Sequence, residues 1–216
     1  MKDKQPCFIT CLSAPSGGGK TVVVQKLAQM ASTSIALYFD EYDDLAEGAN
    51  VHPESLRQRI LDGADYNAWQ MPGLIRDLER LRQGQAIQSV ANGNILAPQP
   101  LVFLDAAIGR ANDRLRPYID LMVYIDTPLD IAMARRIQRD YFGRKQDEVK
   151  RMDAGETLAQ IDGMTTAYLD WAREAYLALA NQVKPLSDLI IDGSLPVVEV
   201  AQQVITHLKL GERDIA

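Results

Sequence analysis

The chain has 216 residues, of which 47% are hydrophobic and 24% are charged, and its formal net charge at pH 7 is −6. This length fits one α/β domain with a substantial core, and the composition is that of an ordinary globular protein. The negative charge argues against a general nucleic-acid binder, because such a protein carries a positive field over its surface.

The N-terminal residues predict neither a cleaved leader nor a membrane anchor. Met1–Lys4 and the apolar residues after them resemble a signal peptide only superficially, since the apolar part is short and runs into the glycine-rich stretch described next. No run approaches the ~18 apolar residues that a membrane-spanning helix needs. The two cysteines, Cys7 and Cys11, share one face of a predicted strand but lie too far apart along it to form a disulfide. We therefore expect a cytoplasmic protein without a membrane partner.

The first predicted strand, about residues 7–13, leads into a glycine-rich stretch and then into a run of helix formers. The stretch is Ala14, Pro15, Ser16, Gly17, Gly18, Gly19, Lys20 and Thr21. This order is the context of a Walker A phosphate-binding loop, although Ala14 stands where the motif has its first glycine. Glycines let successive backbone N–H groups turn toward one anion, and the helix N-terminus adds positive charge. We therefore predict that residues 16–21 bind a nucleoside triphosphate, with Lys20 on the β- and γ-phosphates and Thr21 on Mg²⁺.

The second predicted strand, residues 34–39, ends in an acidic group. Its members are Asp40, Glu41, Asp43 and Asp44, with Tyr42 among them. In open α/β sheets ligands bind at the carboxyl ends of the strands, so these carboxylates are expected beside the phosphate site. Residues 45–70 are poorly periodic and are predicted to line a substrate cleft as loop and short helix. An amphipathic helix at 71–84 and a β-hairpin that turns at Asn92-Gly93 are predicted after them.

Two more buried strands are predicted farther along the chain. In the first, residues 100–107, four apolar residues precede Asp105, a Walker B-like pattern whose carboxylate would hold Mg²⁺ through water. Residues 121–125 form the next strand, and the helix after it carries the only concentrated basic segment of this acidic chain. That segment contains Arg135, Arg136, Arg139, Arg144 and Lys145.

Residues 188–191 form the last predicted strand, which ends at Asp192-Gly193, and Ser194 is expected to cap the final helix. The alternation of strands and helices predicts a three-layer α/β sandwich, in which helices cover both faces of a five-stranded parallel sheet. Together with the Walker A loop, this architecture is that of the P-loop NTPase class. We predict a single domain over residues 1–216, with an arginine-bearing lid at about residues 135–155.

Four features outside the loop follow one order along the chain. They are Asp40-Glu41-Tyr42 after a strand, a hydrophobic strand that ends at Asp105, and the segments 114–128 and 134–140. In this order they resemble the uridine kinase/phosphoribulokinase-like group of small-molecule kinases, in which the last of these segments leads into the arginine-bearing lid. The resemblance spans about residues 8–208 and is weakest over 45–100.

The resemblance implies transfer of the γ-phosphate of ATP, with Mg²⁺, to a hydroxyl of a small metabolite such as a nucleoside, a sugar or a vitamin-type alcohol. In this group the aspartate that ends the second strand is the general base near Mg²⁺, and Asp40 matches it. Asp105 matches the acidic metal residue, although the group usually has Glu-Gly where this chain has Asp105-Ala106. The resemblance also implies that the lid arginines (Arg135, Arg136, Arg139 or Arg144) contact phosphate. It further implies that Asp65 and Tyr42 contact the acceptor and that Asp192 and Gly193 contact adenine.

Two other functions stay open. The loop from Ser13 to Lys20 is similar to that of guanylate kinase, which would make a nucleoside monophosphate the acceptor, but the Arg- and Tyr-bearing GMP segment of that enzyme is not visible. A nucleotide-binding switch without phosphotransfer would fit the departure at Asp105-Ala106. The alternatives to a catalytic role are that Asp40 belongs to a solvated turn and that the arginines belong to a solvated helix face. The expected partner is a small-molecule acceptor and not nucleic acid, and the sequence predicts no oligomeric state.

Overall fold

The computed structural model describes residues 7–42, 65–142 and 154–213 of the chain, with side chains as far as residue 208. Its main sheet has five parallel strands in the order β2-β5-β1-β6-β7. The strands are β1 (Phe8–Ser13), β2 (Ser34–Tyr38), β5 (Leu101–Asp105), β6 (Leu121–Asp126) and β7 (Leu189–Asp192). The predicted five-stranded parallel sheet is therefore confirmed.

Helices alternate with these strands along the chain. The α-helices of the described part are α1 (Lys20–Met30), α3 (Pro72–Arg82), α4 (Leu129–Ile137), α5 (Ala154–Ala167), α6 (Arg173–Val183) and α7 (Val197–Arg213). One π-helical turn, Gln138–Phe142, follows α4, and another, Tyr168–Ala172, precedes α6. No helix in the described ranges is long and apolar enough to cross a membrane.

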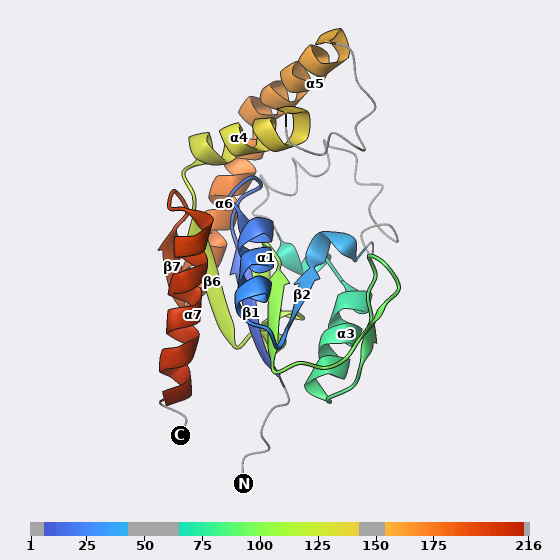
Figure 1. The fold of residues 1–216 in the computed structure, drawn as a ribbon. Coiled ribbons are helices and arrows are strands. Elements are labelled where there is room, and N and C mark those ends of the chain that lie inside the picture. Colours follow the sequence, from blue (N-terminus) through green and yellow to red (C-terminus); the bar gives the residue numbers. More distant parts are fainter. Residues whose placement is uncertain (1–6, 43–64, 143–153, 214–216) are drawn as a thin grey trace.

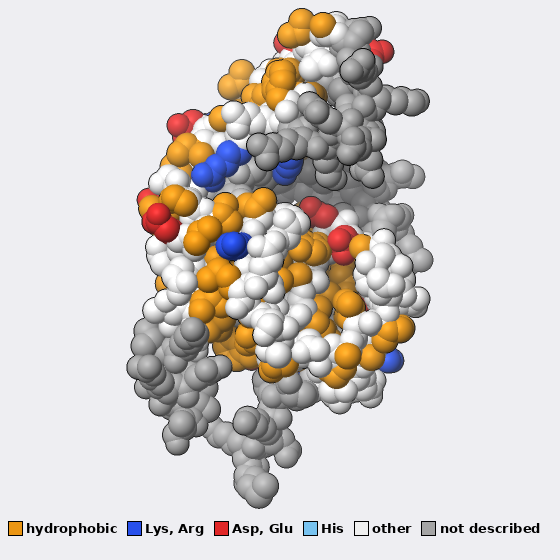
Figure 2. Space-filling model, viewed as in Figure 1, with side chains coloured by type: hydrophobic (Ala, Val, Ile, Leu, Met, Phe, Trp, Pro, Cys, Tyr) orange, Lys and Arg blue, Asp and Glu red, His pale blue; other side chains and the backbone are white. Residues whose placement is uncertain are grey.

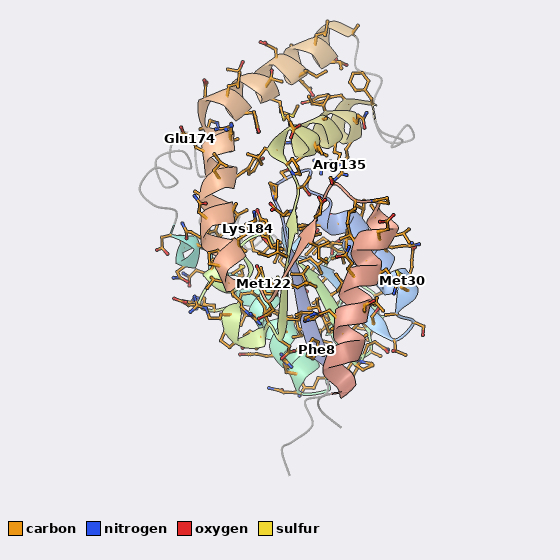
Figure 3. The ribbon with its side chains drawn as sticks, turned by 90° about the vertical axis from the view of Figure 1, so that its left-hand side faces the viewer. Phe8, Met30, Met122, Arg135, Glu174 and Lys184 are labelled. Carbon is orange, nitrogen blue, oxygen red and sulfur yellow. The ribbon has the colours of Figure 1, made fainter. Side chains whose placement is uncertain are left out.

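The sheet lies between two layers of helices, so the predicted three-layer sandwich is confirmed (Figures 1 and 3). One face packs against α1 and α7, and the opposite face packs against α3 and α6. The first core includes Leu12, Val23, Leu27, Phe103, Val123, Ile125, Val200 and Val204. The second core includes Ile9, Leu74, Leu78, Val102, Leu104, Met122, Leu179 and Val183. Since both faces are covered, the central strands are almost continuous apolar runs.

Because the strands are parallel, their carboxyl ends meet at one edge of the sheet, and α4 and α5 lie beyond that edge (Figure 1). The phosphate loop, between β1 and α1, is at this edge, as are the ends of β2 and β5. The predicted hairpin is also present, as the antiparallel pair β3 (Ile87–Gln88) and β4 (Ile95–Leu96).

One predicted helix cap is wrong. Ser194 does not cap the final helix, because α7 begins at Val197, after Pro196. The backbone N–H and the hydroxyl of Ser194 both donate to Asp192 Oδ1, at 2.8 and 2.7 Å. Ser194 is thus part of a local turn closed by the Asp192 carboxylate, three residues before the first residue of the helix.

Thr10, in the central strand β1, provides a test of core energetics. Its side chain is 0% exposed, and its hydroxyl has no hydrogen-bond partner among the described residues. Valine has nearly the same shape without the desolvation cost of an unpaired hydroxyl. We expect Thr10→Val to raise the free energy of unfolding by about 1 kcal/mol, or Tm by about 2–4 °C, in urea and thermal unfolding. Lower stability of the variant would mean that the hydroxyl has a partner.

Candidate active site

The phosphate loop connects the end of β1 to the start of α1. Gly17 and Gly19 have φ values of 79° and 97°, the left-handed region that favours glycine. A Cβ at Gly17 would also overlap the carbonyl oxygen of Ala132, so the loop lies directly against α4. The loop and the N-terminus of α1 together present the backbone donors and the positive helix end that bind phosphate.

Lys20, Thr21 and Asp105 meet at the base of this loop. Lys20 Nζ donates to the carbonyl oxygen of Ala14 at 3.0 Å, which folds the ammonium group back over the loop. Thr21 Oγ1 donates to Asp105 Oδ2 at 2.6 Å. Asp105 ends β5, the strand beside β1, and only 8% of it is exposed. The strand order therefore brings a carboxylate to the hydroxyl that follows the loop lysine.

The Thr21–Asp105 pair has the chemistry of a Mg²⁺ site. Mg²⁺ prefers oxygen ligands and is usually bound through one or two carboxylates, waters and substrate phosphates. No group of three or more His, Cys, Asp or Glu side chains suitable for a metal gathers within the described residues. A site that depends on bound phosphate for its remaining ligands fits this donor set, and Thr21 and Asp105 are the residues that would hold the ion.

Asp40 lies in the 3₁₀ turn Phe39–Glu41, directly after β2. Since β2 pairs with β5, the carboxyl ends of these strands are neighbours, with Tyr38 opposite Asp105. Asp40 is exposed, and its charge acts on both Asp105 and Arg139. Figure 2 shows acidic side chains near the end of β2 and basic side chains on the side of α4. The carboxylates and the α4 arginines therefore face one region.

The three described arginines of the basic segment each donate a hydrogen bond to a different residue. Arg135 Nη1 donates to the carbonyl oxygen of Gly193 at 2.8 Å, and Figure 3 shows Arg135 just below α4. Arg136 Nη1 donates to the hydroxyl of Tyr176 on α6 at 3.0 Å. Arg139 Nε donates to Asp140 Oδ1 at 2.6 Å. Burial acts to raise the pKa of Asp140, but Arg139 and Arg136 outweigh it and hold that pKa below its usual value. Arg144 lies outside the described residues.

A cavity of about 300 Å³ lies beside the phosphate loop. It is lined by Gly18, Gly19, Val22, Val23, Ile125, Arg135, Gly193, Ser194, Leu195, Pro196, Val197 and Val200. Apolar side chains form most of this lining, and the flat guanidinium group of Arg135 is held at its edge by Gly193. A mostly apolar cavity with a few polar groups, next to a phosphate site, suits a nucleotide base. The predicted site residues Arg135 and Gly193 both line this cavity.

Two predicted acceptor residues have other contacts in the structure. Tyr42 is only 6% exposed, packs in the core, and donates its hydroxyl to Asp77 Oδ2 at 3.1 Å. Its burial does not support the predicted contact with substrate, because the ring has no free face to offer. Asp65 is exposed and accepts a hydrogen bond from the Asn67 N–H at 2.9 Å, as the N-cap of a short 3₁₀ turn. Asp65 therefore has a local structural role in this state.

Sequence reasoning missed two residues that contact the site. Thr127 Oγ1 donates to the carbonyl oxygen of Gly18 at 2.8 Å, inside the phosphate loop. Thr127 lies at the carboxyl end of a buried strand, which is the signal that identified Asp40 and Asp105. The rule that ligands bind at the carboxyl ends of strands would therefore also have identified Thr127. Tyr176, the partner of Arg136, lies on α6 far along the chain and has no such signal.

The charge state of Asp105 gives a second testable prediction. Burial raises the pKa of this carboxyl; Lys20 and the Thr21 hydroxyl act in the opposite direction, and Asp40 adds to the rise. A carboxyl whose pKa is higher in the folded state than in the unfolded state favours folding at pH values below its unfolded-state pKa. That contribution is lost as pH rises through the folded-state value. The ionised form of Asp105 therefore lowers the stability of the ligand-free protein.

We expect Asp105→Asn to raise the free energy of unfolding at pH 7 by about 1 kcal/mol, a gain of the size seen when a destabilised functional group is neutralised. The gain should shrink as pH falls and the wild-type carboxyl takes up a proton. Urea unfolding at several pH values measures this difference, and the affinity for ATP with Mg²⁺ should fall in the same variant. A variant less stable than the wild type at pH 7 would contradict the argument.

The fold and the phosphate loop define the class: the chain is a P-loop protein of the three-layer α/β type. Residues 9–158 match the sequence model of the Phosphoribulokinase / Uridine kinase family, and the chain belongs to this family. It is therefore an ATP-dependent kinase that phosphorylates a small metabolite. This membership disfavours the switch without phosphotransfer.

Relatives with similar sequences are also named as kinases of this family. A uridine kinase of Borrelia duttonii (strain Ly) is 26% identical over 190 residues, which cover 83% of this chain and 84% of the relative. A uridine kinase of Brevibacillus brevis is 27% identical over 187 residues, covering 82% and 80% of the two chains. A solved structure of a possible uridine kinase from Bacillus stearothermophilus has a TM-score of 0.50 and 11% identity, covering 89% and 91%. At that identity the structural likeness shows the fold alone.

Proposed function

We propose that this chain transfers the γ-phosphoryl group of ATP to a hydroxyl of a nucleoside, with uridine as the first acceptor to test. The observation that carries the proposal is the meeting of Lys20, the Thr21–Asp105 pair and Asp40 at the ends of three adjacent strands. The choice of a nucleoside acceptor rests on the relatives named as uridine kinases.

The residues have distinct proposed roles around the transferred group. Lys20 leaves the carbonyl oxygen of Ala14 and binds the β- and γ-phosphates through the same ammonium group. Thr21 and Asp105 are the residues that would hold Mg²⁺, and the ion would neutralise negative charge on the phosphate oxygens. Asp40 accepts the proton of the acceptor hydroxyl, which it also orients for attack. Positioning and charge neutralisation are what phosphoryl transfer requires.

Arg135 of α4 and Arg139 of the π-helical turn after it act at two ends of the nucleotide in this proposal. Arg135, held by Gly193, forms one side of the base cavity, which then holds adenine near Asp192 and Gly193. Arg139 interacts electrostatically with Asp40 and is the described arginine we assign to charge on the transferred phosphoryl group. Arg144 stays a prediction for the same role.

We also propose that residues 1–216 form one domain whose lid is at about residues 135–155; residues 143–153 of this range lie outside the described part. The contacts of α4 with the phosphate loop and with Gly193 support a lid that begins at the nucleotide site. Closure of such a lid would exclude water, which otherwise competes with the acceptor for the phosphoryl group.

The proposal is tested by ADP release with Mg²⁺-ATP and separate acceptors: uridine, cytidine, other nucleosides, sugars and vitamin-type alcohols. We expect ADP release to depend on one nucleoside and the product to carry a phosphate ester on a former hydroxyl, as seen by mass spectrometry. A response to a nucleoside monophosphate alone would support the guanylate kinase-like alternative instead. ADP release with no acceptor dependence at all would contradict the proposal.

A further inference from the structure

Thr127 lies where three segments of the nucleotide site meet. It directly follows β6, and Pro128 after it is the N-cap of α4, the helix that carries the arginines. Its side chain is almost fully buried, with 4% of the residue exposed. It is therefore an internal residue of the site and not one that solvent or an acceptor would reach.

The side chain of Thr127 contacts both loops that line the base cavity. Its Oγ1 donates to the carbonyl oxygen of Gly18, in the phosphate loop, at 2.8 Å. Gly193 also lies against this side chain, because a Cβ at Gly193 would overlap Thr127 Oγ1 and would lie 2.9 Å from Thr127 Cα. The Gly193 N–H also donates to the carbonyl oxygen of Asp126 at 3.0 Å. The loop after β7 therefore packs against Thr127 and is hydrogen-bonded to Asp126, the residue before Thr127.

These contacts set the spacing between two halves of one binding site. Gly18 belongs to the phosphate loop, and Gly193 belongs to the loop at the base end, yet both line the same 300 Å³ cavity. A ligand that has phosphates at one end and a base at the other engages both loops at once. Its affinity depends on how well their separation matches the ligand before binding, because any rearrangement costs binding free energy.

We propose that Thr127 is a positioning residue that holds the phosphate loop and the base-side loop in register, so that one nucleotide engages both. This inference rests on the proposed function only in taking ATP as the nucleotide. Its effect is specific: loss of the Oγ1 hydrogen bond weakens ligands that span both loops. Ligands that engage the phosphate loop alone are affected little.

Two substitutions separate the hydrogen bond from the shape of the side chain. Thr127→Val keeps the branched shape but removes the donor to Gly18, whereas Thr127→Ser keeps the donor and removes a methyl group. The matched control is Thr10→Val, which makes the same change at a buried threonine in β1 whose hydroxyl has no partner among the described residues. It reports what the substitution does to a core strand outside the site.

The experiment measures dissociation constants by isothermal titration calorimetry for ATP and for inorganic tripolyphosphate, both with Mg²⁺ and without acceptor. We expect Thr127→Val to weaken ATP binding about 10-fold, equivalent to about 1.4 kcal/mol, and tripolyphosphate binding less than about twofold. Thr127→Ser should keep the ATP dissociation constant within about threefold of the wild type. Thr10→Val should leave both constants unchanged.

Three results obtained with the variants would overturn the inference. These are wild-type ATP affinity in Thr127→Val, an equal loss for ATP and tripolyphosphate, or an equal loss in Thr10→Val. The equal loss for both ligands would mark a local effect within the phosphate loop. Because no acceptor is present, the test is separate from that of the proposed function. ATP binding with the expected Thr127 pattern but without acceptor-dependent ADP release would overturn only the proposed function. An unaltered chain that does not bind ATP would overturn both.

Discussion

Lys20→Met is expected to lower kcat by about 10²–10³-fold with the best acceptor, a loss typical of removing one charged or donor group from a transition state. The ammonium group of Lys20 already lies over the phosphate loop, 3.0 Å from the carbonyl oxygen of Ala14. It therefore reaches bound phosphates by a change of side-chain partner alone. Methionine keeps an unbranched side chain of similar length but supplies no charge to the β- and γ-phosphates. Steady-state kinetics with Mg²⁺-ATP measure the loss.

Lys26→Met is the matched control for this substitution. Lys26 lies in the same helix α1, and we assign it no role in the site. The control should keep kcat and the KM for ATP close to the wild-type values. If Lys20→Met kept kcat within tenfold of the wild type while ATP remained bound, Lys20 would have no part in the transfer step.

The order of the strands explains why the carboxylates of the site come together. The sequence indicates that Asp40 and Asp105 each follow a buried strand, and the carboxyl-end rule then puts both at one edge. Which strands are neighbours is a property of the sheet, in which β5 lies between β1 and β2. That order gives Asp105 its hydrogen bond from Thr21 on one side and the charge of Asp40 on the other.

Side-chain direction was harder to predict from the sequence than strand position. The carboxylates after β2 are predicted to lie beside the phosphate site and Tyr42 to contact the acceptor, but the chain enters a 3₁₀ turn at Phe39. The turn leaves Asp40 exposed and rotates Tyr42 into the core against Asp77. Adjacent residues also point in different directions on α4, where Arg135 contacts Gly193 and Arg136 contacts Tyr176. Such directions depend on partners that are distant along the chain.

Asp40→Asn is expected to lower kcat by about 10²–10⁴-fold and to leave the dissociation constant for ATP within about threefold. Asparagine keeps the size and the hydrogen-bonding shape of the side chain but cannot accept the proton of an acceptor hydroxyl. Asp40 is exposed, so the substitution removes no core packing and should preserve the fold. Calorimetric ATP binding and acceptor-dependent ADP release, measured on the same preparation, separate the two effects.

Glu41→Gln provides the matched control, because Glu41 lies next to Asp40 in the same turn and carries the same charge. The two variants change the local charge equally, so any difference between them comes from the position of the carboxylate and not from the net charge of the turn. We expect Glu41→Gln to keep kcat within about threefold of the wild type, as for a substitution outside the reacting groups. Equal losses in both variants would reduce Asp40 to one member of an acidic surface, whereas a loss confined to Asp40→Asn identifies it as the base.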